Sequence, residues 1–340
     1  MKESNPIISA PSADEGLEDS VEAAAEVEWR EWVVPQALHG VRLDRALAEL
    51  VPEFSRSYLQ QLIEAGAVMQ GAVALRKPAH KVKAAEQGVI ALRPTPQSQA
   101  FKPQAMPLDI VYEDAHLLVI NKPAGLVVHP APGNWSGTLL NGLLAHDTHA
   151  SFLPRAGIVH RLDKDTSGLM VVARTRATMD ALVHLIAQRE VSRQYLALAH
   201  QRWSGAARRE VEAPIGRDPR NRLRMAVVDL ARHAGKPAKT SIDLLANGEQ
   251  GCWLRCTLHT GRTHQIRVHL ASLGHPLVAD TLYGGVAAAG LQRQALHAFR
   301  LAFTHPVTGQ ALLFRAALPP DMENALSDWG LGYNAAQEDL

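Results

Sequence analysis

The segment from Val159 to Ala173, VHRLDKDTSGLMVVA, constrains the fold of this chain more than any other. Its second half is an apolar run behind a polar turn, which predicts a buried strand. Just ahead of that strand lie Arg161 and two carboxylates, Asp163 and Asp165. A carboxylate at the mouth of a strand, two residues after an arginine, fits a nucleophile or base that a neighbouring cation keeps ionised. Taken alone, the same residues also fit an ordinary surface turn.

Short apolar segments with strand character dominate the chain after residue 106, for example DIVYE, LLVIN, LMVVA, YLALA and WLRCTL. One helix stands out from about Ala177 to Gln188, because apolar residues recur there at helical spacing. Near the C-terminus, LHAFRLAF and ALLFRAAL predict two strands joined by a turn at Pro306 to Gly309. The pattern predicts an α+β domain built on a long mixed or antiparallel sheet.

A smaller module with a different pattern precedes this domain. The leucines of LDRALAEL predict one short helix, and Ser55 then caps a second short amphipathic helix that ends near Gly66. Short strands are expected around a turn at Gln70 and Gly71, and a last strand near Val89 to Leu92. Two helices and a small sheet make a compact module.

The formal net charge of +1 hides an uneven distribution. Residues 1–30 hold eight acidic and two basic side chains, and residues 321–340 hold five acidic and no basic ones. The stretch between them therefore holds 33 basic against 21 acidic side chains. This excess suits a ligand bound through its phosphates, although solvated surface charges would give the same count.

These patterns divide the chain into five expected segments. Residues 1–37 are expected to be a disordered acidic tail, because little periodic apolar content is available to form a core. Residues 38–95 form the small module, and residues 96–106 read as a proline-containing linker. Residues 107–322 form the α+β domain, and residues 323–340 a second acidic tail.

Composition excludes some classes of protein. A chain of 340 residues is long enough for two domains with separate cores. No apolar run approaches the roughly 20 residues of a membrane helix, and the N-terminus lacks the basic start and apolar core of a signal peptide. We expect a cytoplasmic protein without membrane contact, and a monomer by default.

Cysteine and histidine spacing does not favour a metal site. Cys252 and Cys256 are the two cysteines, and a single C-x3-C pair on an expected strand reads as core packing. His259, His264 and His269 are spaced by five, which does not place two ligands on adjacent turns of a helix. Structural roles, or contacts with a phosphate-bearing ligand, are expected for these histidines.

Further motifs accompany HRLDKDTSG. They are REVSRQYLALA around Tyr195, HTGRTHQIRVHLASLGHPLVADTLYG from His259 to Gly284, and PLDIVYEDAHLLVINKPAGLVVH from Pro107 to His129. In order and spacing they resemble the signature segments of RluA-type pseudouridine synthases, over about residues 38–320. The resemblance implies an α+β catalytic domain and an RNA substrate. No cofactor is expected, because the isomerisation of uridine adds and removes nothing.

Matching residues acquire roles through this resemblance. Asp163 corresponds to the catalytic carboxylate, Arg267 to the arginine that pairs with it, and Tyr195 to the ring on which the target base stacks. Arg161 corresponds to the residue that enters the RNA stack when the base is flipped out. Two further expected RNA contacts come from the same motifs, Arg262, which is also an alternative partner for the carboxylate, and His264.

Several alternatives stay open at this point. Asp165 is chemically able to compete with Asp163, and a tyrosine on a strand is more often a core residue than a base platform. The carboxylate either attacks C1′ or takes a proton from the sugar, and the sequence does not choose between these routes. A glycosidase using both aspartates is disfavoured, because carboxylates two residues apart rarely face each other across the roughly 5–9.5 Å that reaction needs.

The small module resembles the S4 RNA-binding domain through VRLDRALAELVPEFSRSYLQQLIEAGAV. Two positions depart from the usual patterns: Gln70 precedes Gly71 where S4 domains usually have asparagine, and Ala279 stands where the synthases usually have glycine before Asp280. The S4 resemblance implies RNA contacts from basic side chains around the second helix and the hairpin, namely Arg42, Arg45, Arg56, Arg76, Lys77 and Lys81.

The expected substrate also follows from the resemblance. Within the family the likeness is greatest to synthases of 23S ribosomal RNA, which implies uridines in the helix 69 stem-loop, modified late in large-subunit assembly. Related synthases with similar motifs act on other ribosomal or transfer RNA sites. A non-catalytic ribosome-assembly factor would share the basic body and the S4-like module, and would keep its cellular function in an Asp163→Asn variant.

Overall fold

The computed structural model describes residues 27–92, 100–131 and 133–332. It divides the chain after residue 95 into two compact units, each with its own hydrophobic core. None of the helices in these ranges is long and apolar enough to cross a membrane.

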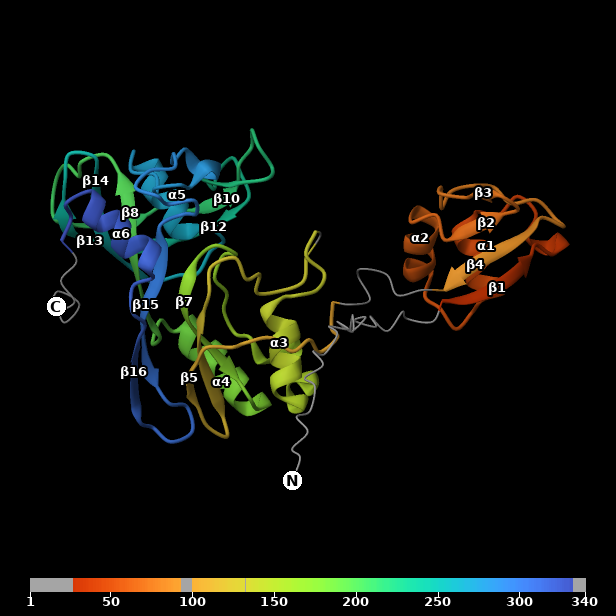
Figure 1. The fold of residues 1–340 in the computed structure, drawn as a ribbon, viewed down its shortest axis with the longest axis horizontal. Helices are drawn as coiled ribbons and strands as arrows, with labels where there is room; N and C mark the ends of the chain where they lie inside the picture. Colours follow the sequence, from red (N-terminus) through yellow and green to blue (C-terminus); the bar gives the residue numbers. More distant parts are fainter. Residues whose placement is uncertain (1–26, 93–99, 132, 333–340) are drawn as a thin grey trace, which may run out of the picture. The chain divides into compact units, whose positions relative to one another are not determined.

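The N-terminal unit combines an antiparallel sheet, in the order β1-β4-β2-β3, with two short helices (Figure 1). The predicted helices are present, and Ser55 caps the second one by accepting a hydrogen bond from the Tyr58 N–H at 3.2 Å. The elements are β1 (Glu28–Val33), α1 (Leu43–Leu50), α2 (Arg56–Glu64), β2 (Val68–Gln70), β3 (Val73–Ala74) and β4 (Gln87–Leu92).

The structure corrects the boundaries of both expected tails. Residues 28–33, which were assigned to the N-terminal tail, form β1, because Trp32 is buried in the core while the main chain pairs with β4. At the other end, helix α6 (Pro320–Asp328) buries Met322 and Leu326 in a core cluster. The remaining parts of the two expected tails, residues 1–26 and 333–340, lie outside the described residues.

The second half of the expected linker belongs to the C-terminal unit. Asn141 donates side-chain hydrogen bonds to the carbonyls of Ala100 and Lys102, at 3.3 and 2.9 Å, and its own carbonyl accepts from the Gln104 N–H at 3.0 Å. Residues 93–99 lie outside the described part of the chain. These hydrogen bonds order a segment that has no apolar periodicity.

The described part of the C-terminal unit contains a nine-stranded sheet in the order β5-β6-β7-β15-β8-β14-β13-β9, with β16 paired to β15. All pairings are antiparallel except β7 with β15, so the sheet is mixed, as predicted. Its strands are β5 (Ile110–Glu113), β6 (Leu117–Lys122), β7 (Ser167–Ala173), β8 (Ser192–His200), β9 (Arg208–Glu212), β13 (Lys239–Asn247), β14 (Gly251–Leu258), β15 (Leu296–Thr304) and β16 (Ala311–Arg315).

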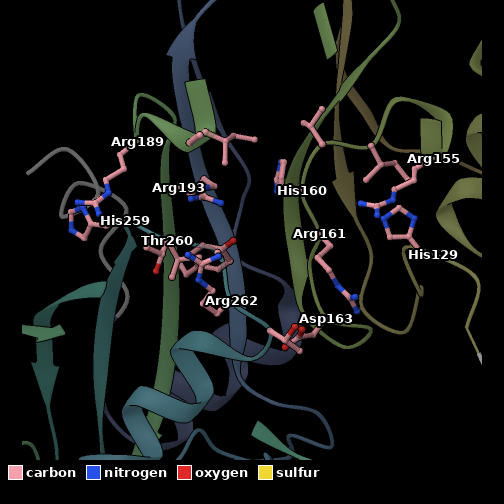
Figure 2. Close-up of a pocket in the computed structure, with 18 residues that line it drawn as sticks. His129, Arg155, His160, Arg161, Asp163, Arg189, Arg193, His259, Thr260 and Arg262 are labelled. Atoms are coloured by element: carbon pink, nitrogen blue, oxygen red, sulfur yellow. The ribbon is translucent and has the colours of Figure 1, made fainter. Parts of the chain in front are cut away.

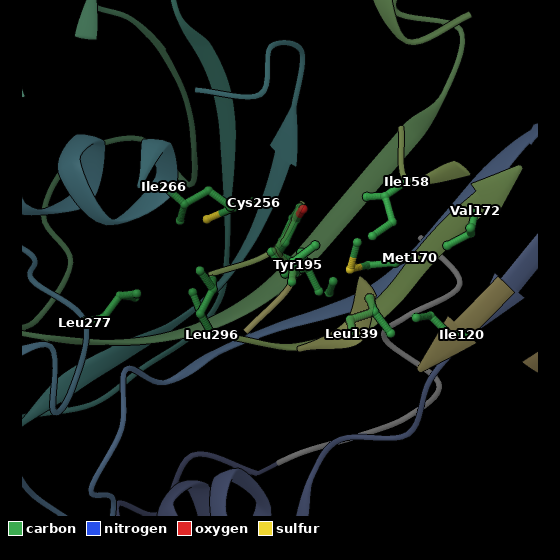
Figure 3. Close-up of a cluster of buried hydrophobic side chains, with 14 of the residues drawn as sticks. Ile120, Leu139, Ile158, Met170, Val172, Tyr195, Cys256, Ile266, Leu277 and Leu296 are labelled. Carbon is green, nitrogen blue, oxygen red and sulfur yellow. The ribbon is translucent and has the colours of Figure 1, made fainter. Parts of the chain in front are cut away.

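Helices cover the sheet on both faces because successive strand residues point to opposite sides. On one face, Met170 and Tyr195 pack with helix α3 (Leu139–His146) and with Cys256, and Figure 3 shows Tyr195 between Cys256 and Met170. On the other face, the neighbouring residues of β7 pack against α4 (Arg176–Ala187), and those of β8 against α6. Helices therefore pack on both faces of the central strands.

A three-stranded side sheet lies next to helix α5 (Gln265–Ser272), and its order is β11-β10-β12. Its strands are β10 (Ile215–Arg217), β11 (Met225–Val227) and β12 (Gly235–Lys236). Helices α3, α5 and α6 were not predicted. In α5 the reason is clear, because polar Gln265, Arg267 and His269 are buried and interrupt the apolar periodicity.

Candidate active site

The predicted strand after HRLDKDTSG is β7, and Asp163 lies in the loop that leads into it. Lys122, at the end of β6, is 1% exposed and anchors the main chain of this loop. Its ammonium donates hydrogen bonds to the carbonyls of Pro123, Leu126 and Lys164, at 2.8, 3.0 and 2.9 Å. The carboxylate of Asp163 therefore projects from a loop whose main chain is fixed on one side.

Arg267 reaches Asp163 from α5, across 104 residues of sequence. Its Nη1 donates a hydrogen bond to Asp163 Oδ2 at 3.0 Å, and both side chains are largely buried, at 8% and 16% exposure. A charge-assisted hydrogen bond between an arginine and a carboxylate is short and directional, so it fixes the orientation of the acid. The structure thus brings together the two residues that the motifs assigned as catalytic acid and partner.

Asp280 is a component of this site that the sequence analysis did not assign. Its carboxylate, 1% exposed, accepts two hydrogen bonds from Arg267, from Nε at 2.7 Å and from Nη2 at 2.8 Å. Burial alone would lower the pKa of Arg267, but the hydrogen bonds and charge of Asp280 hold that pKa above its usual value. The Arg267 guanidinium is shared by two carboxylates, one buried and one facing the cavity.

His264 and Tyr283 complete the surroundings of Arg267. The guanidinium lies 5.0 Å from the centroid of the Tyr283 ring, whose hydroxyl is 2.8 Å from His264 Nδ1. His264 Nε2 lies 3.8 Å from Asp163 Oδ1. Burial lowers the pKa of His264, and the charge of Asp163 opposes that shift. His264, expected to contact RNA, thus lies beside the carboxylate.

A cavity of about 770 Å³ opens in front of Asp163 (Figure 2). Asp163 is the one acidic residue among its lining residues, and Figure 2 shows basic side chains on both sides of it. A smaller space of about 50 Å³ beside it is lined by Asp163 and Tyr195 as well. The basic lining residues are Arg155, Arg161, Arg189, Arg193, Arg262, His129, His160 and His259.

Tyr195 lies on β8 opposite Cys256 and lines both spaces. It is 5% exposed and packed in the core, so the core interpretation and the base-platform interpretation both describe it. Burial raises the pKa of Tyr195 to about 12. The phenol of Tyr195 is therefore neutral at physiological pH, and the residue lines the cavity.

The structure distinguishes Asp163 from Asp165 as the candidate acid, and Arg267 from Arg262 as its partner. Asp163 lines both spaces, whereas Asp165 is among the lining residues of neither. Arg262 donates a hydrogen bond from Nε to the Pro237 carbonyl at 3.0 Å, while Arg267 is the arginine bonded to Asp163. This geometry favours Asp163 as the acid and Arg267 as its partner.

The two cysteines and His269 behave as structural residues in the described part of the chain. Cys252 and Cys256 are buried free thiols on β14, as predicted. His269 contacts the Thr240 hydroxyl at 2.9 Å and the Ala213 carbonyl at 3.0 Å. Within the described ranges no group of three or more histidine, cysteine or acidic side chains is arranged to hold a metal ion.

In the N-terminal unit, two of the expected RNA contacts are engaged by a buried acid. Asp44, 0% exposed, accepts hydrogen bonds from Arg42 at 3.0 Å, from Arg56 at 2.6 Å and from Gln60 at 2.6 Å. Burial alone would raise the pKa of the Asp44 carboxyl, but the Arg42, Gln60 and Arg56 hydrogen bonds hold it far below its usual value. Arg56 and Gln60 therefore fasten α2 to α1, and Arg42 binds Asp44 from the residue before α1.

The other four expected contacts of this unit lie at its surface. Arg45 pairs with Glu49 one helical turn away, at 3.5 Å, and Arg76 donates to the Glu64 carbonyl at 3.4 Å. The remaining two, Lys77 and Lys81, are exposed. All six side chains stay candidates for RNA contact, since Arg42 and Arg56 are also exposed, at 45% and 51%.

Comparison with known proteins places the chain in a family of RNA-modifying enzymes. Residues 116–272 match the family model of RNA pseudouridylate synthase. The ribosomal large subunit pseudouridine synthase D of Neisseria meningitidis serogroup B is 49% identical over 308 residues, covering 86% of this chain and 80% of the relative. The chain therefore belongs to the RNA pseudouridylate synthase family, a family of isomerases.

Further relatives support the same family. The ribosomal large subunit pseudouridine synthase D of Nitrosomonas europaea is 49% identical over 303 residues, covering 86% of this chain and 85% of the relative. Among solved structures, human RNA pseudouridylate synthase domain containing 1 aligns with a TM-score of 0.51 and 27% identity, over 66% of this chain and 90% of that one. The resemblance to RluA-type synthases and the predicted α+β class are confirmed.

Proposed function

We propose that this protein isomerises specific uridines of 23S ribosomal RNA to pseudouridine, with Asp163 as the catalytic carboxylate. The observation that carries the proposal is the single carboxylate in a cavity of basic side chains, hydrogen-bonded to Arg267 at 3.0 Å. The cations suit an RNA backbone, and the carboxylate suits chemistry at C1′ of one nucleotide.

The proposed reaction requires few groups. The C1′–N1 bond breaks, the uracil turns, C5 joins C1′, and the proton of C5 is lost while N1 ends protonated. Asp163 acts either by attacking C1′ or by removing a proton from the sugar, and both routes need its ionised form. Arg267 orients the Asp163 carboxylate, and Asp280 holds Arg267 in place.

Tyr195 supports the base in this scheme. A neutral aromatic ring offers stacking worth roughly 1–3 kcal/mol and lets uracil turn in its own plane. With its pKa raised to about 12 by burial, the phenol keeps its proton at neutral pH and does not act as a base in the resting site. Arg161, exposed at the cavity, is proposed to fill the RNA stack that the flipped nucleotide leaves.

The substrate proposal rests on the relatives, which are named as synthases of the large ribosomal subunit. We propose uridines of the helix 69 stem-loop as the target, presented in an assembling large subunit, with the S4-like unit binding RNA outside the cavity. We further propose that the protein works as a monomer in the cytoplasm. Analytical ultracentrifugation of the purified protein tests the monomer.

The test is a map of pseudouridine in ribosomal RNA from cells lacking the protein and from cells given back wild type, Asp163→Asn or Asp165→Asn. Wild type and Asp165→Asn are expected to restore the lost sites, and Asp163→Asn is not, because its kcat falls by about 10²–10⁴-fold or more. An unchanged 23S map without the protein would refute the ribosomal target. If Asp163→Asn restored growth but not the modification, the assembly-factor role would be favoured.

A further inference from the structure

Arg193 is a buried cation for which the proposed mechanism has no use. It lies on β8, two residues before Tyr195, and is 5% exposed. Its side chain lines the large cavity, where Figure 2 shows it among the labelled residues. Its Nε is buried without a hydrogen-bond partner.

The protein around Arg193 does not neutralise its charge. In the described residues no carboxylate forms an ion pair with it, and its strand neighbours are Leu258 on β14 and Leu301 on β15. The nearby His160 is half-buried, and its desolvation followed by the charge of Arg193 lowers the pKa of that imidazole to about 3. His160 is therefore neutral at physiological pH and adds no second positive charge beside Arg193.

The absence of a side chain at Gly261 leaves space for the Arg193 guanidinium. At Gly261, in the loop after β14, a Cβ would lie 3.0 Å from Arg193 Nη1, which is closer than nearly all real side-chain contacts. Glycine at this position lets the guanidinium lie against the backbone at the edge of the cavity. Burial lowers the pKa of Arg193, but a guanidinium remains charged at neutral pH.

A buried cation without a partner is costly, so its presence in a cavity indicates an anion that arrives from outside. Residues i and i+2 of a strand point to the same face about 6.6–6.8 Å apart, so the anion lies close to any base stacked on Tyr195. We propose that Arg193 binds a backbone phosphate of RNA that flanks the uridine held on Tyr195. This inference rests on the proposed function and adds a specific phosphate contact to it.

Arg193→Met keeps much of the side-chain volume and removes the charge. We expect this variant to bind RNA more weakly without making the free protein less stable. RNA binding is expected to weaken about 10- to 100-fold, because a charge-assisted contact is lost. The slope of log affinity against log salt is expected to become shallower by about 0.7. The Tm of the free protein is expected to stay equal or rise, because an uncompensated buried charge is gone.

The deciding experiment is a coupling measurement between protein and RNA. A stem-loop RNA of 23S helix 69 is synthesised with one neutral methylphosphonate at a time on either side of each loop uridine, and its affinity for full-length wild type and Arg193→Met is measured. One flanking methylphosphonate is expected to weaken wild type about tenfold or more and to have no further effect on Arg193→Met. The control Arg176→Met alters an exposed arginine paired with Asp180 on α4 and is expected to behave as wild type.

Equal methylphosphonate penalties in wild type and Arg193→Met at every position would overturn the inference. A Tm of Arg193→Met below that of wild type would overturn it too, because the protein itself would then be the partner of the guanidinium. Pseudouridine formation in the unmodified RNA is measured separately. Its absence with wild type counts against the proposed function alone, because the coupling is read from binding.

Discussion

At the scale of single residues, the pairing of Arg267 with two carboxylates explains how the site holds its acid. Asp280 is 2% exposed and binds two nitrogens of the guanidinium, which leaves Nη1 for Asp163. Asp280 follows Ala279, whose φ of +60° is a conformation that glycine adopts more readily. The backbone is therefore strained next to the residue that fixes Arg267.

We predict that Asp280→Asn lowers kcat about 10- to 100-fold with a smaller change in KM, because Arg267 is no longer held in one orientation. The free energy of unfolding should fall by about 3–5 kcal/mol, since half of a buried ion pair is lost. Steady-state kinetics well below the Tm of the variant check this. The control is Asp180→Asn on the exposed surface of α4, and an unchanged kcat in Asp280→Asn would show that Asp163 alone positions Arg267.

The motifs named Asp163, Tyr195 and Arg267, and the structure brings the three together around the small space of about 50 Å³, which makes them testable together. Asp280 was overlooked although it stands in the quoted segment LVADTLYG, because a carboxylate in a loop carries no signal of the arginine it meets. Arg193 was overlooked for a similar reason. Its burial without a counter-charge is visible only when the surrounding strands are in place.

At the scale of elements, the β7–β15 junction determines where the catalytic loop emerges. This is the parallel pairing of the sheet, with Ser167 opposite His297 and Gly168 opposite Ala298. Gly168 has φ of +113°, and a Cβ there would lie 2.2 Å from the Ala298 carbonyl oxygen. The two strands approach this closely because residue 168 has no side chain.

We predict that Gly168→Ala lowers the free energy of unfolding by more than about 2 kcal/mol, because backbone strain and a clash with Ala298 add together. The control is Gly205→Ala, where φ is +101° but no heavy atom lies within 4 Å of the added methyl group, so this variant carries the strain alone. Urea unfolding of both variants checks the difference. Equal losses of stability would show that the close approach adds nothing.

The buried His297 on β15, at the same junction, predicts that the stability of the protein depends on pH. Burial lowers the pKa of His297 to about 4 in the folded protein, from 6.5 when unfolded. Below pH 6.5 the unfolded chain therefore takes up a proton that the folded chain does not, and stability falls as pH falls toward 4. In His297→Gln we expect this slope to shrink by about 1.4 kcal/mol per pH unit. Urea titrations between about pH 7 and about pH 4.5 check it, and an unchanged slope would show that His297 is protonated without unfolding.

At the scale of the whole molecule, charge is divided between a basic body and acidic ends. The structure shows that part of what was assigned to the acidic ends is folded, since β1 begins at Glu28 and α6 runs to Asp328. A test of the N-terminal charges must therefore stop before β1. Residues 1–26 hold seven acidic side chains and one basic one.

We predict that deleting residues 1–26 strengthens binding to non-target RNA a few fold at low salt, because repulsion between these acids and phosphates is removed. The effect should vanish near about 0.5 M salt, where charges are screened. Filter binding with an unrelated RNA stem-loop, over a series of salt concentrations, checks it. An unchanged affinity at low salt would show that the acidic segment does not influence RNA binding.

The sequence by itself determined the family, the α+β class, the two helices of the small module and the candidate acid, because these depend on local spacing and long contiguous motifs. Only the tertiary structure decided which arginine meets Asp163, which acid holds that arginine, and which of the expected RNA contacts are engaged by Asp44. The physical reason is that an ion pair depends on distance and burial. Both are set by tertiary packing, which brings Arg267 to Asp163 across 104 residues of the chain.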